Sequence, residues 1–449
     1  TDWWLNDMYL SVPLALPINS NPGLAARPKT FSNQKEAAIF LARFLTELLN
    51  YQEILDRSEL DVDEVKSKDG KSMQPLCMAQ HYQMYRIYRR PGANGDEQII
   101  LDRTTSGNHI IVAHHNLFYS VPVRAPDRGR ITETELAQQI LKIMETKADP
   151  RTPPVGILTT MKRPAWAKAR EELLKRTFEE LTEKVDAMSP PEENTVPSHL
   201  PAPEKLEWHL SEQSFSDIRD AMISFDALVE DLDLCILWFQ EYSKEFIKSH
   251  KISPDVYIQL ALQFTHFRLH GNLVATYESA GIRRFALGRV DCIRAASPEA
   301  LNWAKAMCQG DPDSQTQQER IKELFDLAVQ RQTKEMNDNI NGYGIDNHLM
   351  GLRYAAQEVG EPVPDIFTDQ AYKIVNHFAL STSQVTSKND AIIGYGPVVP
   401  DGYGCAYNLR SNGFIFSVSA FHSDGKTNAT RFAQTLEQSL RDMADMLNK

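Results

Sequence analysis

Cysteine is scarce in this sequence, with five among 449 residues, and no two of them form a Cys-x-x-Cys pair. This scarcity argues against a disulfide framework and a zinc site and fits a reducing compartment such as the cytoplasm. No apolar run is long enough to span a membrane, and Trp3, Trp4 and Asp7 interrupt any signal-peptide core. The net charge of −12 disfavours binding to nucleic acid or to anionic membranes. These absences predict a soluble cytoplasmic protein.

The length and composition are sufficient for two domains. A chain of 449 residues exceeds the size at which a single core stops growing, and its 42% hydrophobic residues can fill two cores. From Met188 to Pro203 the sequence turns to Ser, Pro and Glu without periodicity, which indicates a linker. We therefore predict a first domain over residues 1–188, a linker over 189–205 and a second domain over 206–449.

Besides a short helix expected at residues 178–188, three helices are predicted in the first domain. Apolar residues follow a wide helical stripe over residues 37–49. Thr132 and Glu135 have the form of a capping box ahead of an apolar-periodic helix that runs through Ile143. Another helix is expected to start near Pro164.

Strands are predicted on both sides of a histidine pair. Residues 110–113 and 117–123 are rich in Val, Ile, Phe and Tyr and flank His114-His115-Asn116, as the strands of a hairpin would. On adjacent strand or turn positions the two histidines would face different ways, so we interpret the pair as structural. Residues 155–158 have the composition of a further short strand.

The second domain opens with a long apolar seam and a group of lysines. Apolar residues between Phe215 and Phe239 recur in steps of three and four, which predicts one long buried helix. Lys244 and Lys248 follow, four residues apart on one helix face, with Lys251 close behind.

A new helix is predicted directly after these lysines. Ser253 before Pro254 is typical of an N-cap followed by a first-turn proline. The free N–H groups and the positive dipole end of such a helix, beside two lysines, form a candidate phosphate site. The alternative is an ordinary solvated helix face.

Two stretches near the C-terminus carry special backbone requirements. Ser381-Thr382-Ser383-Gln384-Val385 ends an apolar run, and ten residues later comes the turn-rich Tyr395-Gly396-Pro397-Val398-Val399-Pro400-Asp401-Gly402-Tyr403-Gly404. Together they resemble the signature of the carnitine/choline O-acyltransferases. Other stretches lie in that family's order and roughly at its spacing: Asp2-Trp3-Trp4, Gln74-Pro75-Leu76-Cys77-Met78, Thr276-Tyr277-Glu278-Ser279, Gly288-Arg289-Val290-Asp291 and Asn347-His348-Leu349.

The resemblance implies an α/β fold of two domains, each a mixed sheet flanked by helices, with a substrate tunnel between them. It implies a monomer that transfers an acetyl group from acetyl-CoA to an alcohol, without a permanently bound cofactor or a metal. The positions that resemble the family's coenzyme A contacts are Lys244, Lys248, Lys251, Asp255 and Ser279. The lysines would hold the 3′-phosphate, and Asp255 would lie at the adenine end.

Two positions sort the acceptor substrate within the family. Members that bind carnitine meet its carboxylate with an arginine and a threonine, whereas the matching positions here are Asn347 and Val290. Neither can neutralise a carboxylate, and an unpaired anion in a closed site costs on the order of several kcal/mol. The resemblance therefore implies choline as the acceptor and acetylcholine as the product, with carnitine as the alternative. For Asn347 the competing interpretation is an ordinary helix-surface amide.

A trimethylammonium group is a soft cation that suits aromatic faces and hydroxyl oxygens. Tyr277 matches a tyrosine that faces this group in the family, and Tyr395 would help by analogy, although a buried tyrosine beside a turn is equally a structural residue. The full set of implied acceptor-site residues is Tyr277, Val290, Asn347, Ser381, Thr382, Tyr395 and Val398.

Acyl transfer to an alcohol requires a general base near neutral pKa, usually histidine. It also requires hydrogen-bond donors for the oxyanion, a role for Ser383 or for Ser381 and Thr382 beside it. In the family the base lies in a Glu-His-x-x-x-Glu/Asp-Gly segment, preceded by an Arg-Trp-Phe/Tyr-Asp-Lys strand and a His-Gly-Gly-Gly loop. All three lie between the stretches that match Trp166-Ala167-Lys168-Ala169 and Leu206-Glu207-Trp208.

None of these three segments occurs in the sequence, and none of its twelve histidines has the expected neighbours. Between Lys168 and Trp208 only a short helix, expected at residues 178–188, and the linker remain. The family's helical region ahead of Thr1 is not in the sequence either. Two interpretations stay open: a catalytically silent member that binds coenzyme A or a quaternary amine, or part of a complete enzyme. The retained choline-site residues favour the second.

Overall fold

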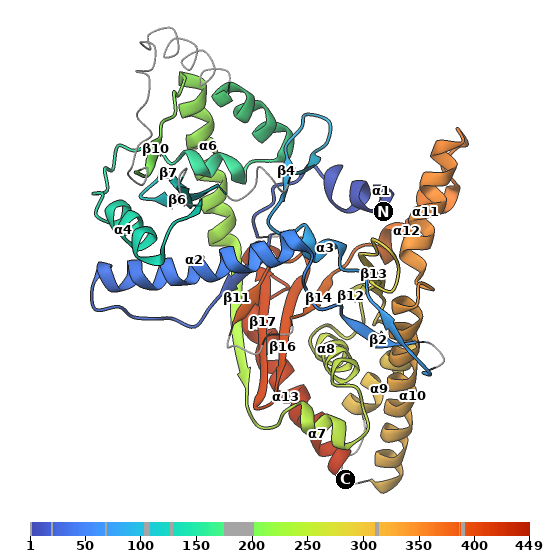
Figure 1. Cartoon of the computed structure of the whole chain (residues 1–449). Helices are drawn as coiled ribbons and strands as arrows, with labels where there is room; N and C mark the ends of the chain where they lie inside the picture. Colours follow the sequence, from blue (N-terminus) through green and yellow to red (C-terminus); the bar gives the residue numbers. More distant parts are fainter. Residues whose placement is uncertain are drawn as a thin grey trace, which may run out of the picture. The chain divides into compact units, whose positions relative to one another are not determined.

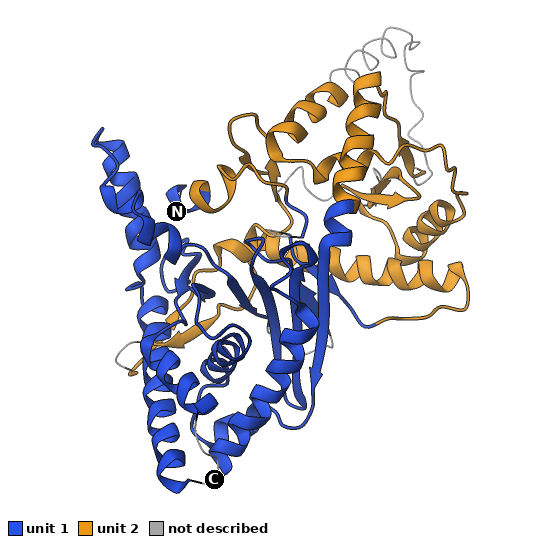
Figure 2. Ribbon diagram, turned by 180° about the vertical axis from the view of Figure 1, so that it is seen from behind, with its two compact units in different colours: residues 1–5, 16–27, 227–449 blue, residues 6–15, 28–226 orange. Residues whose placement is uncertain are grey.

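The computed structural model describes residues 2–18, 21–67, 70–102, 108–125, 129–174, 202–309, 314–385, 387 and 391–449. It divides into two compact units, coloured separately in Figure 2. Unit 1 comprises residues 1–5, 16–27 and 227–449, and unit 2 comprises residues 6–15 and 28–226. The helix expected at 178–188 and the predicted linker as far as Pro201 lie outside the described residues. The boundary at 189–205 therefore stays a prediction.

Unit 1 is built around a six-stranded mixed sheet in the order β11-β17-β16-β14-β12-β13 (Figure 1). Strand β14 runs parallel to both of its neighbours, and the other pairs are antiparallel. A separate antiparallel pair joins β1 to β15. The strands are β1 (Gly23–Ala25), β11 (Leu232–Phe239), β12 (Thr276–Gly281), β13 (Val290–Ile293), β14 (Leu380–Gln384), β15 (Ile392–Gly394), β16 (Tyr403–Arg410) and β17 (Gly413–Phe421). The mixed sheet confirms the predicted α/β class.

The core of unit 1 lies between this sheet and the helices α8, α9, α10 and α13. Residues 256–266 of α8 are all buried, which explains why its sequence shows no polar face. The helices of unit 1 are α1 (Asp2–Leu5), α7 (Lys244–Ser249), α8 (Pro254–His270), α9 (Pro298–Gln309), α10 (Gln315–Ile340), α11 (Ile345–Glu358), α12 (Gln370–Val375) and α13 (Ala429–Asn448), with the 3-10 turns η3 (Asp365–Phe367) and η4 (His422–Asp424).

The first residues belong to this unit because their aromatic side chains pack on α11. Trp3 stacks on Tyr354 at a ring-centroid distance of 5.8 Å, and its indole Nε1 donates to Glu358 at 2.8 Å. The predicted start of α8 is confirmed at Pro254, with Ser253 as an extended N-cap residue whose side chain makes no capping hydrogen bond.

The predicted helix from Phe215 to Phe239 is wrong over its last eight residues. Helix α6 (Glu212–Asp231) ends at Asp231, and the next eight residues form β11, in register with β17 along their whole length. The residues of β11 suit a strand as well as a helix, because its Leu, Ile, Trp and Phe residues fit both the two-residue repeat of a strand and the three- to four-residue repeat of a helix. Pairing with β17, which is nearly 190 residues away in sequence, decides between them.

Unit 2 contains a three-stranded antiparallel sheet in the order β10-β7-β6, packed on α2 and α4 through a small apolar core. Its helices are η1 (a π-helix, Asn6–Leu10), α2 (Gln34–Arg57), α3 (Ala79–Tyr82), α4 (Glu133–Met144) and α6, with residues 163–174 also helical. Its strands are β2 (Glu64–Lys66), β3 (Met73–Pro75), β4 (Ile87–Arg90), β5 (Glu97–Ile100), β6 (His109–His114), β7 (Leu117–Pro122), β8 (Arg124–Ala125), β9 (Gly129–Arg130) and β10 (Glu204–Leu206).

The sequence predictions for this unit hold for the helices and the hairpin. Helix α2 covers residues 37–49, both hydrogen bonds of the Thr132–Glu135 capping box are present, and a helix runs through Pro164. The hairpin β6–β7 turns at His115 and Asn116, which both have positive φ.

Two predictions in unit 2 are wrong. The rings of His114 and His115 do not face different ways, since their centroids lie 3.9 Å apart; the left-handed backbone at His115 brings them together. The predicted strand at 155–158 is a 3-10 helix, η2 (Val155–Thr160). Its first turn is closed by the Ile157 N–H, which donates to the Pro154 C=O at 2.9 Å, and it follows directly on Pro153 and Pro154.

Candidate functional site

Strand β14 carries Ser381, Thr382 and Ser383 in the middle of the unit 1 sheet, between β12 and β16. Because successive side chains on a strand point to opposite faces, the two serines share one face and Thr382 points to the other. Thr382 is 1% exposed; its hydroxyl donates to the Tyr277 C=O at 2.8 Å and accepts from Gln259 Nε2 of α8 at 3.0 Å. Thr382 therefore belongs to the face covered by α8.

The turn-rich stretch after β15 places Tyr395 against β14. The Tyr395 hydroxyl donates to the Ser381 C=O at 2.9 Å, and its own C=O accepts from Ser419 Oγ at 2.6 Å. A Cβ at Gly404 would lie 2.5 Å from Ser419 Oγ and 3.2 Å from Tyr395 Cε2, so this approach requires glycine. Burial raises the pKa of Tyr395, which remains a neutral phenol.

Tyr277 lies beside this group. It is the register partner of Ser381 on the neighbouring strand β12, and its ring meets Phe378 edge-on at a centroid distance of 5.6 Å. The structure thus brings together Tyr277, Ser381 and Tyr395. Val398 is 44% exposed in the turn that follows Tyr395.

The two acceptor-sorting positions are direct neighbours. Asn347, in the first turn of α11, donates its side-chain amide to the Val290 C=O at 3.1 Å. Its backbone N–H donates to Asp291 Oδ1 at 3.2 Å. Asp291 is 4% exposed, and burial raises its pKa. The amide of Asn347, the aliphatic side chain of Val290 and the buried carboxyl group of Asp291 thus lie together at one corner of the sheet.

The contact between Asn347 and Val290 and the group of Tyr277, Ser381 and Tyr395 lie at different positions along the sheet. Val290 pairs with Gly281 of β12, four residues beyond Tyr277, which corresponds to about 13 Å along a strand.

The predicted coenzyme A residues gather where α7 leads into α8. Lys244 opens α7, and Lys248 forms an ion pair with Glu245 at 3.1 Å. Lys251 takes a left-handed conformation, with φ 60°, in the turn before α8. Asp255 lies in the first turn of α8, half-buried, and accepts a hydrogen bond from Tyr407. Ser279 is exposed on β12, apart from this group in sequence.

Sequence reasoning missed the buried polar residues between α8 and the sheet. Gln259, Glu278, Gln332 and Tyr407 are each at most 5% exposed. A signal was present, because Gln259 and Gln263 stand one helical turn apart in an otherwise apolar stretch and polar residues inside a buried helix require partners.

Several histidines of unit 1 have defined partners, and three of them bear on the search for a base. His266 is buried, and burial lowers its pKa to about 4. His270 Nε2 lies 3.0 Å from the Tyr403 hydroxyl. His377 Nε2 lies 2.7 Å from Asp401 Oδ1 in an exposed pair. Of these, only His377 has the carboxylate partner typical of a catalytic base.

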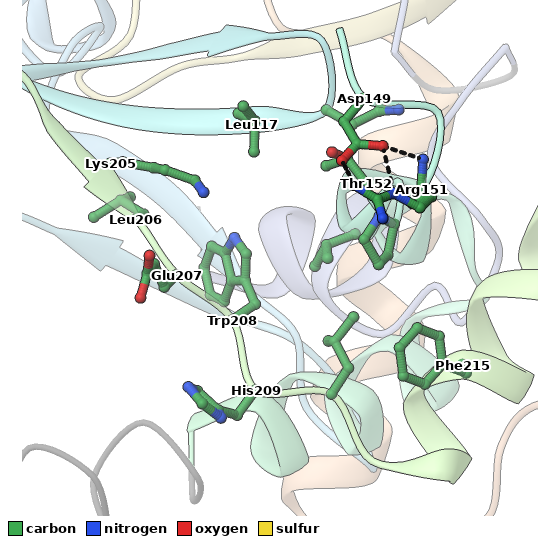
Figure 3. Close-up of a pocket in the computed structure, with 14 residues that line it drawn as sticks. Leu117, Asp149, Arg151, Thr152, Lys205, Leu206, Glu207, Trp208, His209 and Phe215 are labelled. Atoms are coloured by element: carbon green, nitrogen blue, oxygen red, sulfur yellow. Dashed lines mark hydrogen bonds and ion pairs between the residues drawn. The ribbon is translucent and has the colours of Figure 1, made fainter.

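A cavity of about 570 Å³ lies in unit 2, and none of the residues that line it is a predicted site residue (Figure 3). Asp149 and Arg151, joined by side-chain hydrogen bonds, stand at one side of it, and Trp208 lies on the extended segment after β10. Its lining mixes apolar and charged groups of both signs, a pattern that selects no class of ligand.

Comparison with known proteins defines the class of this chain as acyl-group transferases. The family model described as Choline/Carnitine o-acyltransferase matches residues 1–189 and 175–438. The chain therefore belongs to the choline/carnitine O-acyltransferase family.

The relatives of this chain include choline and carnitine O-acetyltransferases. It is 37% identical to choline O-acetyltransferase of Drosophila melanogaster, over 99% of this chain and 78% of that protein. It is 34% identical to choline O-acetyltransferase of Sus scrofa, over 99% of this chain and 82% of that protein. It is 33% identical to carnitine O-acetyltransferase of Columba livia, over 100% of this chain and 83% of that protein.

The alignments also show that relatives contain residues that this chain lacks. The alignment with the Columba livia protein extends over 530 positions, whereas this chain has 449 residues, so at least 81 of those positions have no counterpart here. The two stretches matched by the family model meet at residues 175–189. That these positions include the general base stays a prediction.

Two further findings favour no particular function. A condensation domain of the polyketide synthase MokA aligns over 97% of this chain and 98% of its own, but at 10% identity and a TM-score of 0.31 the likeness supports no conclusion. Within the described part of the chain, no helix is long and apolar enough to cross a membrane.

Proposed function

We propose that this chain is built to transfer the acetyl group of acetyl-CoA to choline, giving acetylcholine and coenzyme A. The observation that carries the proposal is that Asn347 and Val290 are uncharged neighbours. The side-chain nitrogen of Asn347 lies 3.1 Å from the Val290 carbonyl oxygen, and the Asn347 backbone N–H donates to the buried Asp291. A carnitine carboxylate at this corner would meet a carbonyl oxygen and a carboxyl group instead of a cation. Arg294 does not supply that cation, because its Nε and Nη2 atoms form an ion pair with Asp346 and its Nη1 donates to the Val375 C=O.

The proposed reaction is attack by the choline oxygen on the thioester carbonyl carbon. The C–O bond forms, the C–S bond breaks, and the proton of the hydroxyl passes to a base and from there to the departing thiolate. Ser383, with Ser381 on the same face of β14, would donate hydrogen bonds to the oxyanion, an effect typically of ~3 kcal/mol per donor. Their place on a central strand held by two neighbours favours fixed donors.

The acceptor's cationic group is proposed to lie against Tyr277 and Tyr395. Both rings are held in place, Tyr277 by its edge contact with Phe378 and Tyr395 by its hydrogen bond to Ser381. Neutral phenols and ring faces attract a trimethylammonium group without requiring a counter-ion. Val398 completes the proposed acceptor site by resemblance only. Thr382 is left out of it, because its side chain is 1% exposed and its hydroxyl is engaged on the α8 face, opposite the serines.

Coenzyme A is proposed to bind at Lys244, Lys248, Lys251, Asp255 and Ser279. The N-terminus of α8, a helix of 17 residues, supplies N–H groups and a positive dipole end beside the lysines. A bound 3′-phosphate would compete with Glu245 for the ammonium group of Lys248.

Replacing Lys244 and Lys248 together by alanine is expected to weaken coenzyme A binding at least tenfold and to leave dephospho-coenzyme A binding within about twofold. Each lysine contributes a charge-assisted hydrogen bond only when the 3′-phosphate is present. Titration calorimetry of both ligands measures the two dissociation constants. Lys334→Ala on α10, which removes a lysine paired with Asp338, is the matched control. If the binding of both ligands weakened equally, the assignment of these lysines to the 3′-phosphate would be contradicted.

Two alternatives remain within this proposal. A carnitine O-acetyltransferase activity is favoured by the Columba livia relative, and a silent member that binds coenzyme A or a quaternary amine is favoured by the absent positions around residues 175–189. We also propose that the protein is a cytoplasmic monomer.

A further inference from the structure

A buried chain of hydrogen bonds on the α8 face of the unit 1 sheet joins Asp255 to Thr382. We propose that Tyr407 and Gln259 are positioning residues that hold the Asp255 carboxylate toward the adenine amino group of coenzyme A and tie it to strand β14. This inference rests on the proposed coenzyme A site. It assigns a role to two residues that neither the sequence patterns nor the resemblance singled out.

The direction of every hydrogen bond in the chain is fixed. Gln259 Nε2 lies 3.0 Å from Thr382 Oγ1 and 2.9 Å from the Tyr407 hydroxyl, and its two hydrogens serve these two acceptors. Each hydroxyl keeps its own proton to donate onward. Thr382 donates to the Tyr277 C=O at 2.8 Å, and Tyr407 donates to Asp255 Oδ1. Reversing the Gln259 amide would leave both hydroxyls without a donor, so the network also fixes its orientation.

A second partner holds Asp255 from the side. Glu278 hydrogen-bonds Asp255, and Gln332 Nε2 donates to Glu278 Oε2 at 2.7 Å. Burial and the neighbouring Asp255 carboxylate raise the pKa of Glu278 well above its usual range, which favours a protonated Glu278 beside Asp255. The Asp255 carboxylate is thus flanked by the Tyr407 hydroxyl, which donates to it, and by Glu278.

These contacts limit the rotation of Asp255 where the site is proposed to receive adenine. The residue is half-buried, whereas Tyr407 and Gln259 behind it are 2% and 0% exposed. An oriented carboxylate can accept a hydrogen bond from an exocyclic amine, and a carboxylate that is free to turn loses part of that selectivity. The same hydrogen bonds fix Thr382, so a displacement of Asp255 is transmitted to the strand of Ser381 and Ser383.

The test compares coenzyme A with 1,N6-etheno-coenzyme A, whose modified adenine has no N–H donor. For the unmodified chain, titration calorimetry is expected to give about tenfold tighter binding of coenzyme A, the effect of one hydrogen bond to a charged group. Tyr407→Phe is expected to reduce that ratio to about twofold or less. Gln259→Leu is also expected to reduce the ratio, because it removes the hydrogen bond that Gln259 donates to Tyr407.

Matched controls separate positioning from loss of stability. Tyr257→Phe removes a buried hydroxyl of α8, bonded to Tyr242 at 2.9 Å, and Gln263→Leu removes a buried amide of the same helix, bonded to Thr276 at 3.0 Å. Both controls are expected to lower the melting temperature as much as the test variants and to keep the tenfold ratio. An unchanged ratio in Tyr407→Phe overturns the positioning role alone. Failure of the unmodified chain to bind coenzyme A, or to distinguish the two ligands, overturns the proposed site together with this inference.

Discussion

Replacing Asn347 by arginine together with Val290 by threonine is expected to reverse the acceptor preference from choline to carnitine. The guanidinium would pair with the carnitine carboxylate in the corner that now holds an amide and a carbonyl oxygen. It would repel choline, which offers only a cation. We expect the ratio of kcat/KM for carnitine to that for choline to rise at least a hundredfold, equivalent to about 3 kcal/mol. The measurement requires a form of the protein that includes the histidine segment.

The control for this switch is Asn347→Gln with Val290→Thr, which adds length and a hydroxyl but no charge. It is expected to change the ratio by less than about fivefold, since no ion pair forms. Asp291 accepts the Asn347 backbone N–H, so its contact survives both substitutions. An unmodified enzyme that already preferred carnitine, or a ratio that the double substitution left unchanged, would contradict the choline assignment and leave only the family assignment.

The 449-residue chain is expected to transfer acetyl groups at least 10²- to 10⁴-fold more slowly than a family member that contains the histidine segment, because loss of a general base alone has that effect. A coupled assay of coenzyme A release from acetyl-CoA, with and without choline, measures the rate. Restoring the segment from the Drosophila melanogaster relative between the two matched stretches is the positive control, and it is expected to raise the rate by the same factor.

Clear turnover by the chain alone would refute this prediction and would point to a histidine already present. His377 is the first one to replace, because Asp401 holds its Nε2 at 2.7 Å and it stands four residues before Ser381. His377→Gln would abolish such a rate if His377 were the base. His422→Gln, a substitution just after β17, serves as the control.

Local signals predicted elements whose contacts are close in sequence. The capping box at Thr132, the hairpin around His115 and the proline-led start of α8 were all readable, because each depends on residues a few positions apart. The end of α6 was not readable, since β11 exists through pairing with β17. The sequence likewise does not show that Asn347 touches Val290, 57 residues away, although the resemblance implied that both serve one substrate.

The candidate site shows the same limit. Ser381, Thr382 and Ser383 appear equivalent in sequence, whereas the alternation of β14 sends Thr382 toward α8 and leaves the serines on the opposite face. The polar side chains behind the site, such as Gln259 and Tyr407, can be assigned only when helix and sheet are placed together. Their hydrogen bonds join α8 to β14 and β16, two strands that lie more than a hundred residues further along the chain.

The central claim is that this chain retains a site for choline and not for carnitine, and competitive binding tests it most directly. Titration calorimetry of the purified chain, saturated with coenzyme A, gives the dissociation constants of both acceptors in one buffer. The account predicts that choline binds at least tenfold more tightly than carnitine, a difference of about 1.4 kcal/mol. Tighter binding of carnitine, or equal binding of the two, would contradict it.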